Sequence, residues 1–113
     1  TQWIAYLKAR YGDANTSTGI RYYNLDNEPD LWHDTHRDLH PETLTYAELR
    51  DNQRAYAAAI KAADPAAKTL GPSSWGWTNY FYSPRDIEGG NWWSNPIDRS
   101  NYGNLDFVAY YLQ

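Results

Sequence analysis

The order and the lengths of the chain's segments predict an α/β fold with parallel strands. Helical and extended patterns alternate along the 113 residues, as in strands joined by crossover helices. Segments that lead from a helix to a strand are short (13–19 and 64–67), whereas segments that follow strands are long (29–44 and 72–104). In a (β/α)₈ barrel the loops after the strands form the active-site face. The sequence therefore predicts part of such a barrel, with a doubly wound sheet as the alternative.

Composition and charge exclude several classes of protein. The chain has six Trp and eleven Tyr but no Cys, which excludes disulfide frameworks, thiolate metal sites and Cys nucleophiles. Its ten Lys and Arg residues stand singly and the net charge is −4, which argues against nucleic acid or an anionic membrane as a partner. No apolar run approaches the roughly 18–20 residues of a membrane-spanning helix. We expect a folded piece of one larger domain with aromatic side chains at its surface.

The first helix and the first strand have local boundary signals. Residues 2–11 are predicted to be helical, and Gly12 follows at the position of a left-handed C-cap. The apolar face of this helix consists of Trp3, Ile4, Leu7 and Tyr11. Residues 20–25 are rich in β-branched and aromatic types and are predicted to form a strand. Pro29 restricts Glu28 to an extended backbone, so we expect the strand to stop there.

The middle of the chain is predicted to be a polar loop followed by the longest helix. Residues 30–44 have no apolar stripe and are expected to be nonhelical. Thr45 and Glu48 form a capping-box signature, in which the two residues satisfy each other's backbone donors. The helix is predicted to end at Ala63. Its core face consists of Leu49, Tyr56, Ile60 and Ala63.

The last part of the chain is predicted to contain one more strand and one more helix. Residues 68–70 are expected to form a strand that Gly71 and Pro72 end. The stretch 72–104 is rich in aromatic, Gly and Asn residues and is predicted to be a long loop. Residues 105–112 then show a helical pattern.

The most informative local feature is Asn27-Glu28-Pro29 at the end of the first predicted strand. A carboxylic acid that protonates a leaving oxygen needs partial burial and a fixed position, and the carboxyl end of a rigid strand suits both. Asn27 can hydrogen-bond a substrate hydroxyl, provided that a bulge or twist brings it to the same side as Glu28. The alternative is that the tripeptide only ends the strand.

Aromatic side chains gather after the second predicted strand. They are Trp75, Trp77, Tyr80, Phe81 and Tyr82. Sugar rings pack their C–H faces on flat aromatic rings, so this cluster suits a polysaccharide. Trp75 and Trp77 directly follow the strand end and are the candidate substrate-binding residues, with packing inside the loop as the alternative. Trp92 and Trp93 are expected to be structural.

The three histidines have a spacing that suggests a metal site. His33, His36 and His40 are three and four residues apart, which would align them on one helix face. However, Pro41 forces an extended residue before it, and no apolar stripe supports a helix. We therefore expect no metal and no cofactor, but histidines that are hydrogen-bonded to the interspersed acids, with sugar contact by one histidine as the alternative. These acids are Asp34, Asp38 and Glu42.

A longer string around the tripeptide resembles glycoside hydrolase family 44, a family of endoglucanases and xyloglucanases. The string is Tyr-Tyr-Asn-Leu-Asp-Asn-Glu-Pro-Asp-Leu-Trp-His-Asp-Thr-His at 22–36, continued by His-Pro-Glu at 40–42. The resemblance extends to the helix at 2–11, the helix start at 46–49, the turn at 62–65, Gly71-Pro72 and the closing residues 110–112. It implies that residues 1–113 are a single partial catalytic domain, roughly helix 3 to helix 5 of a TIM barrel.

Carried over by position, the resemblance makes Glu28 the general acid/base and Asn27 the residue that hydrogen-bonds the sugar 2-hydroxyl. It implies retaining, endo-acting hydrolysis of a β-1,4-glucan such as cellulose or xyloglucan, with a second glutamate as nucleophile. In this clan the nucleophile follows strand 7, so we expect it outside this segment, which alone would be inactive. The other glutamates of the segment are poor candidates for this nucleophile, since they are a loop acid, a capping-box partner and an acid of the long loop. They are Glu42, Glu48 and Glu88. The resemblance further implies a secreted, extracellular enzyme that is a monomer when complete.

Two other functions stay open. A noncatalytic carbohydrate-binding module would use the same aromatic loop, Trp75 to Tyr82, but it needs no acid at a strand end and its strands would usually be antiparallel. A metal-dependent hydrolase would use the histidine loop at 33–40, and metal analysis with chelator sensitivity would test it.

Overall fold

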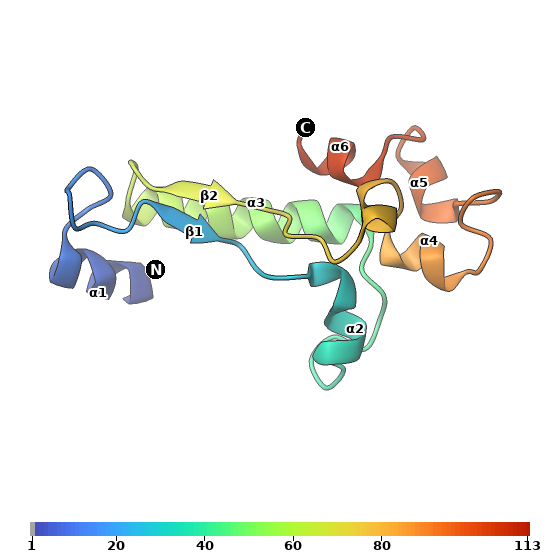
Figure 1. The fold of residues 1–113 in the computed structure, drawn as a ribbon, viewed down its shortest axis with the longest axis horizontal. Helices are drawn as coiled ribbons and strands as arrows, with labels where there is room; N and C mark the ends of the chain where they lie inside the picture. Colours follow the sequence, from blue (N-terminus) through green and yellow to red (C-terminus); the bar gives the residue numbers. More distant parts are fainter. Residues whose placement is uncertain (1) are drawn as a thin grey trace. The chain divides into compact units, whose positions relative to one another are not determined.

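The computed structural model describes residues 2–113, which form an α/β structure with a two-stranded sheet (Figure 1). The chain divides into two compact units. We call residues 2–25 and 52–71 the strand unit, and residues 26–51 and 72–113 the loop unit. The elements, of which η1 and η2 are 3₁₀-helices, follow in this order: α1 (Gln2–Tyr11), β1 (Tyr22–Asn24), η1 (Pro29–Leu31), α2 (Trp32–Thr35), α3 (Tyr46–Ala63), β2 (Lys68–Leu70), η2 (Trp77–Tyr80), α4 (Pro84–Glu88), α5 (Ile97–Asn101) and α6 (Phe107–Tyr111).

The two strands of the strand unit pair in parallel, which confirms the predicted strand direction. Tyr23 lies opposite Thr69 in the register. The ladder continues beyond β1, where the Leu25 N–H donates to the Leu70 carbonyl over 3.0 Å. Strand β1 covers residues 22–24 and is shorter than the predicted 20–25. Because α3 connects the two parallel strands, the local topology is that of a βαβ unit.

Helix α1 covers the predicted residues, and Gly12 has the expected left-handed backbone with φ +89°. Only half of the predicted apolar face is buried, however. Ile4 and Leu7 are buried, whereas Trp3 and Tyr11 are exposed. Trp3 stacks instead on Tyr6 of the same helix, with 5.5 Å between the ring centroids. The strand unit also contains a buried hydrogen bond to a side chain, in which the Asp64 carboxylate accepts the Ala14 N–H over 2.9 Å.

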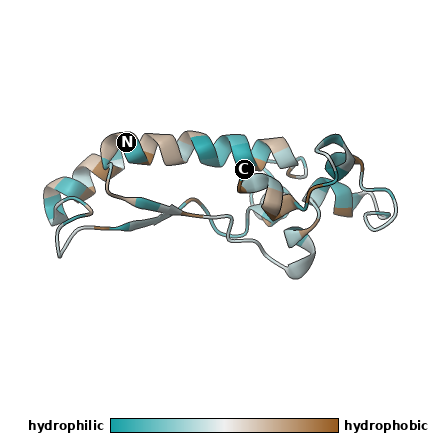
Figure 2. Cartoon of the chain, turned by 90° about the horizontal axis from the view of Figure 1, so that it is seen from above, coloured by the Kyte–Doolittle hydropathy of each residue, from teal (hydrophilic) through white to brown (hydrophobic). Residues whose placement is uncertain are grey.

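Helix α3 begins and ends at the predicted residues, but its first turn is capped differently. The Thr45 hydroxyl accepts the Glu48 N–H over 3.3 Å, as the capping box requires. The Glu48 carboxylate lies instead 2.6 Å from the His40 Nε2. Figure 2 shows hydrophilic residues along much of this helix. The predicted core face is wrong at Tyr56, which is 66% exposed, while Gln53 is buried.

The hydrophobic core of the loop unit is built from rings and leucines. Its buried members are Leu44, Tyr46, Leu49, Phe107 and Tyr110. The Tyr46 ring lies at its centre, edge-to-face with Phe107 at 4.8 Å between centroids. The Tyr46 hydroxyl, whose pKa is raised by burial, lies 3.0 Å from the Phe81 carbonyl and 2.9 Å from the Leu105 carbonyl. This hydroxyl therefore joins two separate stretches of loop.

Several short helices replace the loops that the sequence predicted. Residues 29–35 are helical as η1 and α2, and the stretch 72–104 contains η2, α4 and α5. The last helix covers 107–111 rather than 105–112. Five-residue helices are too short to be stable alone, so their existence depends on the tertiary contacts that cap them. None of the helices in residues 2–113 is long and apolar enough to cross a membrane.

Candidate active site

Glu28 has a left-handed backbone, with φ 52° and ψ 53°, so the predicted extended backbone is wrong. Two hydrogen bonds hold it in this conformation. Its N–H donates to the Ser73 carbonyl over 2.8 Å, and its carbonyl accepts the Leu31 N–H over 2.9 Å. A left-handed backbone costs a residue with a Cβ about 1–2 kcal/mol. The bonds on both sides of Glu28 outweigh the local preference that Pro29 imposes.

This left-handed turn also bears on whether Asn27 and Glu28 point to opposite faces, as they would in a regular strand. Strand β1 ends at Asn24, so residues 27 and 28 do not alternate across a sheet. Asn27 is exposed and Glu28 is half-buried. The Asn27 N–H donates to the Asp26 carboxylate over 2.7 Å. Both candidate side chains thus belong to a turn beyond the carboxyl end of β1, where neighbouring hydrogen bonds fix the backbone.

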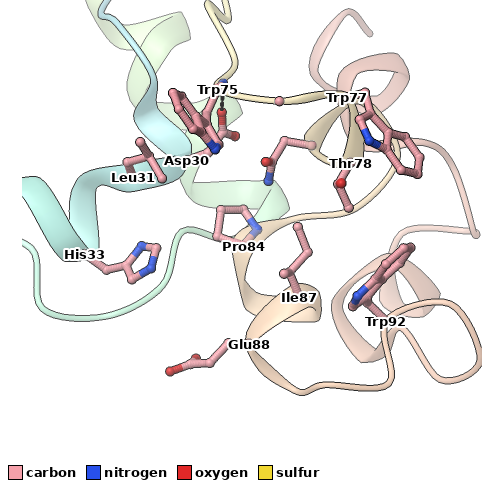
Figure 3. A pocket seen from close by; sticks show the side chains of 12 residues that line it. Asp30, Leu31, His33, Trp75, Trp77, Thr78, Pro84, Ile87, Glu88 and Trp92 are labelled. Atoms are coloured by element: carbon pink, nitrogen blue, oxygen red, sulfur yellow. Dashed lines mark hydrogen bonds between the residues drawn. The ribbon is translucent and has the colours of Figure 1, made fainter.

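Asp30 is a buried acid beside this turn that sequence reasoning missed. Its side chain is 2% exposed. Its Oδ2 accepts the backbone N–H of Trp75 over 2.8 Å, which Figure 3 shows as a dashed line. Burial raises the pKa of the Asp30 carboxyl, the Trp75 N–H lowers it, and the charge of Glu28 raises it further. No local pattern distinguishes Asp30 from the acids around it, because its partner lies 45 residues away along the chain.

The loop unit contains a pocket of about 570 Å³ between the segments 30–33, 75–79 and 84–92. Figure 3 shows Trp75, Trp77 and Trp92 at separate points around it, with His33 and Glu88 on the remaining side. Trp75 is 62% and Trp77 69% exposed. Within residues 2–113 both rings are therefore mostly exposed. Neither Asn27 nor Glu28 lines this pocket.

Trp92 both lines the pocket and packs against another ring of the loop unit. Its ring lines the pocket, and it also packs edge-to-face on Tyr82, with 5.1 Å between the centroids. Trp93 is exposed and its ring stands perpendicular to that of Trp92. The second pair of tryptophans is thus partly a packing element, and only Trp92 reaches the pocket.

Two of the three histidines, His33 and His40, lie beside acids. His33 Nε2 lies 3.7 Å from the Asp34 carboxylate, one of the interspersed acids. His40 pairs with Glu48, which lies outside the predicted set, because the first turn of α3 packs against the end of the histidine loop. Residues 2–113 contain no group of three or more His, Cys, Asp or Glu side chains arranged to hold a metal ion. His33 lines the pocket, so it is the histidine placed nearest to a possible ligand.

Two further buried acids, Asp86 and Asp98, hold the loops around the pocket together. Asp86 accepts the N–H groups of Asp98 and Arg99 at the start of α5, over 2.7 and 3.1 Å. Asp98 accepts the Tyr46 N–H at the start of α3 over 3.0 Å and the Ser83 hydroxyl over 2.8 Å. Burial raises the pKa of Asp98, and these two donors lower it.

A sequence signal for part of this network exists. Ser83-Pro84-Arg85-Asp86 has a capping residue, a proline at the first helical position and an acid three residues after the cap. The Ser83 hydroxyl does accept the Asp86 N–H, over 3.2 Å. This pattern predicts α4, which the expectation of an unbroken loop overlooked. Asp98 has no such signal, because the backbone donor that it accepts at Tyr46 is 52 residues away.

The sequence profile of Glycoside hydrolase family 44 matches residues 1–113. The chain belongs to this family. This membership confirms the resemblance seen around Asn27-Glu28-Pro29.

Individual relatives and solved structures agree with this match. The chain is 43% identical over 109 residues to Endoglucanase A of Paenibacillus lautus, which covers 96% of this chain and 14% of that protein. A crystal structure of CelM2, a bifunctional glucanase-xylanase from a metagenome library, superposes with a TM-score of 0.89 at 42% identity, over 98% of this chain and 22% of CelM2. A family 44 xyloglucanase of Paenibacillus polymyxa, solved with xyloglucan, gives 0.81 at 37% identity, over 98% of this chain and 20% of that chain.

The structural neighbours also identify the fold. They are family 44 enzymes, which implies that the α/β structure of residues 2–113 is part of a TIM barrel. The chain spans about a fifth of the solved neighbours and a seventh of Endoglucanase A.

Proposed function

We propose that the enzyme containing this segment is a retaining, endo-acting β-1,4-glucanase that cleaves cellulose or xyloglucan, with Glu28 as the general acid/base. The observation that carries the proposal is the turn after β1, which fixes the backbone of a half-buried glutamate at both its N–H and its carbonyl. A general acid must be held in one position to protonate a leaving oxygen. Membership of family 44 and the glucan substrates named for its relatives support the substrate class.

In this mechanism Glu28 acts twice. It protonates the leaving oxygen while a second carboxylate, about 5–5.5 Å away, attacks the sugar, and it then deprotonates the water that releases the product. Glu48 and Glu88 are engaged elsewhere, since Glu48 pairs with His40 and Glu88 accepts the Thr43 hydroxyl over 2.8 Å. We place the nucleophile outside residues 1–113, which would then run from about helix 3 to helix 5 of the barrel.

The substrate-binding residues in the proposal are Asn27, Trp75 and Trp77. Exposed indole rings present flat apolar surfaces on which sugar rings stack, and an exposed amide supplies hydrogen bonds to hydroxyls. Asn27 has this exposure, and so do both tryptophans. A secreted enzyme that is monomeric when complete would suit a polymeric substrate outside the cell. The parallel pairing of β1 and β2 speaks against a carbohydrate-binding module, for which antiparallel strands would be usual.

The decisive experiment is Glu28→Gln in a full-length enzyme that contains residues 1–113. The amide is nearly isosteric but cannot donate or accept the required proton. Turnover of unactivated glucan should therefore fall by about 10²–10⁴-fold, the usual contribution of general acid–base catalysis. With a dinitrophenyl glycoside, whose leaving group needs no proton, formation of the glycosyl-enzyme should be largely spared, and added azide should restore its breakdown.

Glu42→Gln is the matched control. Glu42 is an exposed glutamate in the same unit, so its replacement makes the same chemical change away from the turn. It should leave turnover at the parent rate. A folded Glu28→Gln enzyme that hydrolyses unactivated glucan as fast as the parent would rule out the proposal.

A further inference from the structure

Hydrogen bonds join the turn that carries Glu28 to the segment that carries Trp75, and two of them bear directly on the candidate site. The first runs between backbone groups, from the Glu28 N–H to the Ser73 carbonyl, over 2.8 Å. The second depends on one side chain, because the Trp75 N–H donates to Asp30 Oδ2 over 2.8 Å. In the proposed mechanism one of these segments holds the acid and the other holds a sugar-stacking ring. Asp30 is therefore a side chain that connects the two segments.

The Asp30 side chain has little freedom to move. It is 2% exposed, and the preceding Pro29 is fully buried. The turn itself needs outside support, because the left-handed backbone of Glu28 is not one that a glutamate adopts readily. Loss of the carboxylate would leave the Trp75 backbone N–H without its acceptor and would remove a connection between the segments.

We propose that Asp30 is a positioning residue, which sets the place of the acid Glu28 relative to the sugar bound at Trp75. This inference rests on the proposed function of both residues. Asp30 acts through its bond to the Trp75 backbone and through the turn, and it exchanges no proton with the substrate. The requirement at position 30 is thus an acceptor oxygen of the right reach, not a negative charge.

The test compares Asp30→Ala with Asp30→Asn in the full-length enzyme. Misplacement of a catalytic group by about 1 Å can cost about 10²-fold, so Asp30→Ala should lower kcat/KM on unactivated glucan by about 10–100-fold. It should change formation of the glycosyl-enzyme from a dinitrophenyl glycoside by less than about 3-fold, since that step needs no acid. Asp30→Asn keeps an acceptor oxygen and should restore most of the lost activity.

A double variant separates positioning from general damage. Once Glu28→Gln has removed the acid, adding Asp30→Ala should cause little further loss on unactivated glucan, because both changes remove the same contribution. Asp98→Ala is the matched control, as Asp98 is also a buried acid of the loop unit that accepts a backbone N–H. This variant should lower the melting temperature and should reduce the activity on both substrates in equal proportion.

Three results would overturn the inference: Asp30→Ala with parent activity on unactivated glucan, equal losses on both substrates, or Asp30→Asn as impaired as Asp30→Ala. If Asp30→Ala does not fold, Asp30→Ser carries the test, since its hydroxyl is too short to reach the Trp75 N–H and the same split between substrates is expected. A Glu28→Gln enzyme at the parent rate would instead defeat the proposed function itself. The two failures are therefore distinguishable.

Discussion

The strand unit and the loop unit are stabilised in different ways. In the strand unit, a parallel ladder of backbone hydrogen bonds connects regular elements, and the buried apolar residues among those described are Ile4, Leu7, Ala14 and Ala67. In the loop unit, short helices surround an aromatic core, and buried Asp and Ser side chains accept the backbone N–H groups at the helix starts. The candidate active site belongs to the second unit.

The difference teaches why the site region depends on particular side chains. A backbone ladder forms with many sequences, because every residue except proline supplies the same donor and acceptor. A five-residue helix leaves most of its N–H groups without a partner inside the helix. Asp86 accepts two such donors at the start of α5, while Asp98 accepts the N–H of Tyr46 in the first turn of α3 and Asp30 accepts the backbone N–H of Trp75. Substitution in the loop unit should therefore be more costly than at most positions of the strand unit.

The largest effect on stability is expected at the aromatic core of the loop unit. Phe107 is fully buried and packs edge-to-face on Tyr46. Phe107→Ala should lower the free energy of unfolding of the full-length enzyme by about 3–5 kcal/mol, through lost apolar burial and the cavity left behind. Denaturant unfolding measures this loss. Tyr56→Ala, at an exposed ring of α3, is the control and should cost under about 0.5 kcal/mol; equal losses would contradict the comparison.

The buried acids of the loop unit should give the next largest effect, together with a pH dependence. Asp98→Ala removes the acceptor of two donors and should cost about 1–3 kcal/mol. The pKa of folded Asp98 is raised above its ordinary value of 3.8, so the folded state binds this proton more tightly than the unfolded chain. The resulting stability is present below pH 3.8 and is lost as the pH rises through the folded pKa.

Unfolding measured across this pH range checks the sign. Asp98→Asn keeps an acceptor oxygen but cannot titrate, so the free energy of unfolding should fall less steeply with rising pH than it does in the parent. Asp30 has a raised pKa for the same main reason, burial, and it should add a slope of the same sign. A slope unchanged by Asp98→Asn would show that this carboxyl does not titrate differently on folding.

The exposed tryptophans should affect binding rather than stability. Trp75→Ala or Trp77→Ala should raise KM for a long glucan by about 10-fold, equivalent to about 1.4 kcal/mol, and should raise it much less for a short activated glycoside. The melting temperature should be nearly unchanged because both rings are exposed. If both substrates lose activity equally and the melting temperature falls, the ring is part of the core.

The smallest effect tests a backbone position of the strand unit. Gly12 has φ +89°, and a Cβ there would lie 2.5 Å from the Thr16 Oγ1. Gly12→Ala should therefore destabilise the protein by about 1 kcal/mol through the left-handed backbone. Gly76→Ala is the control, since a Cβ at that position meets no atom within 4 Å. Thermal unfolding that ranks Gly76→Ala as the more damaging change would contradict this explanation.

Much of the strand unit could be predicted from the sequence. Helix 2–11 with its glycine cap and the extent of α3 follow from signals that lie within a few residues of one another, and the parallel strand pair follows from the alternation of helical and extended segments along the chain. A local sequence string likewise predicts the family of the chain and places Asn27-Glu28-Pro29 just beyond a strand. These features depend on periodicity, caps and turn residues, whose physical effects are short-range.

Only the tertiary structure decided how the candidate site is assembled. The left-handed backbone of Glu28 depends on Ser73, the position of Trp75 depends on Asp30, and the start of α3 depends on Asp98. The partner is 45 residues away along the chain in the first two cases and 52 residues away in the third. A hydrogen bond between distant residues leaves no periodic mark in the sequence, and it can overrule a local preference when burial removes water as a competing partner.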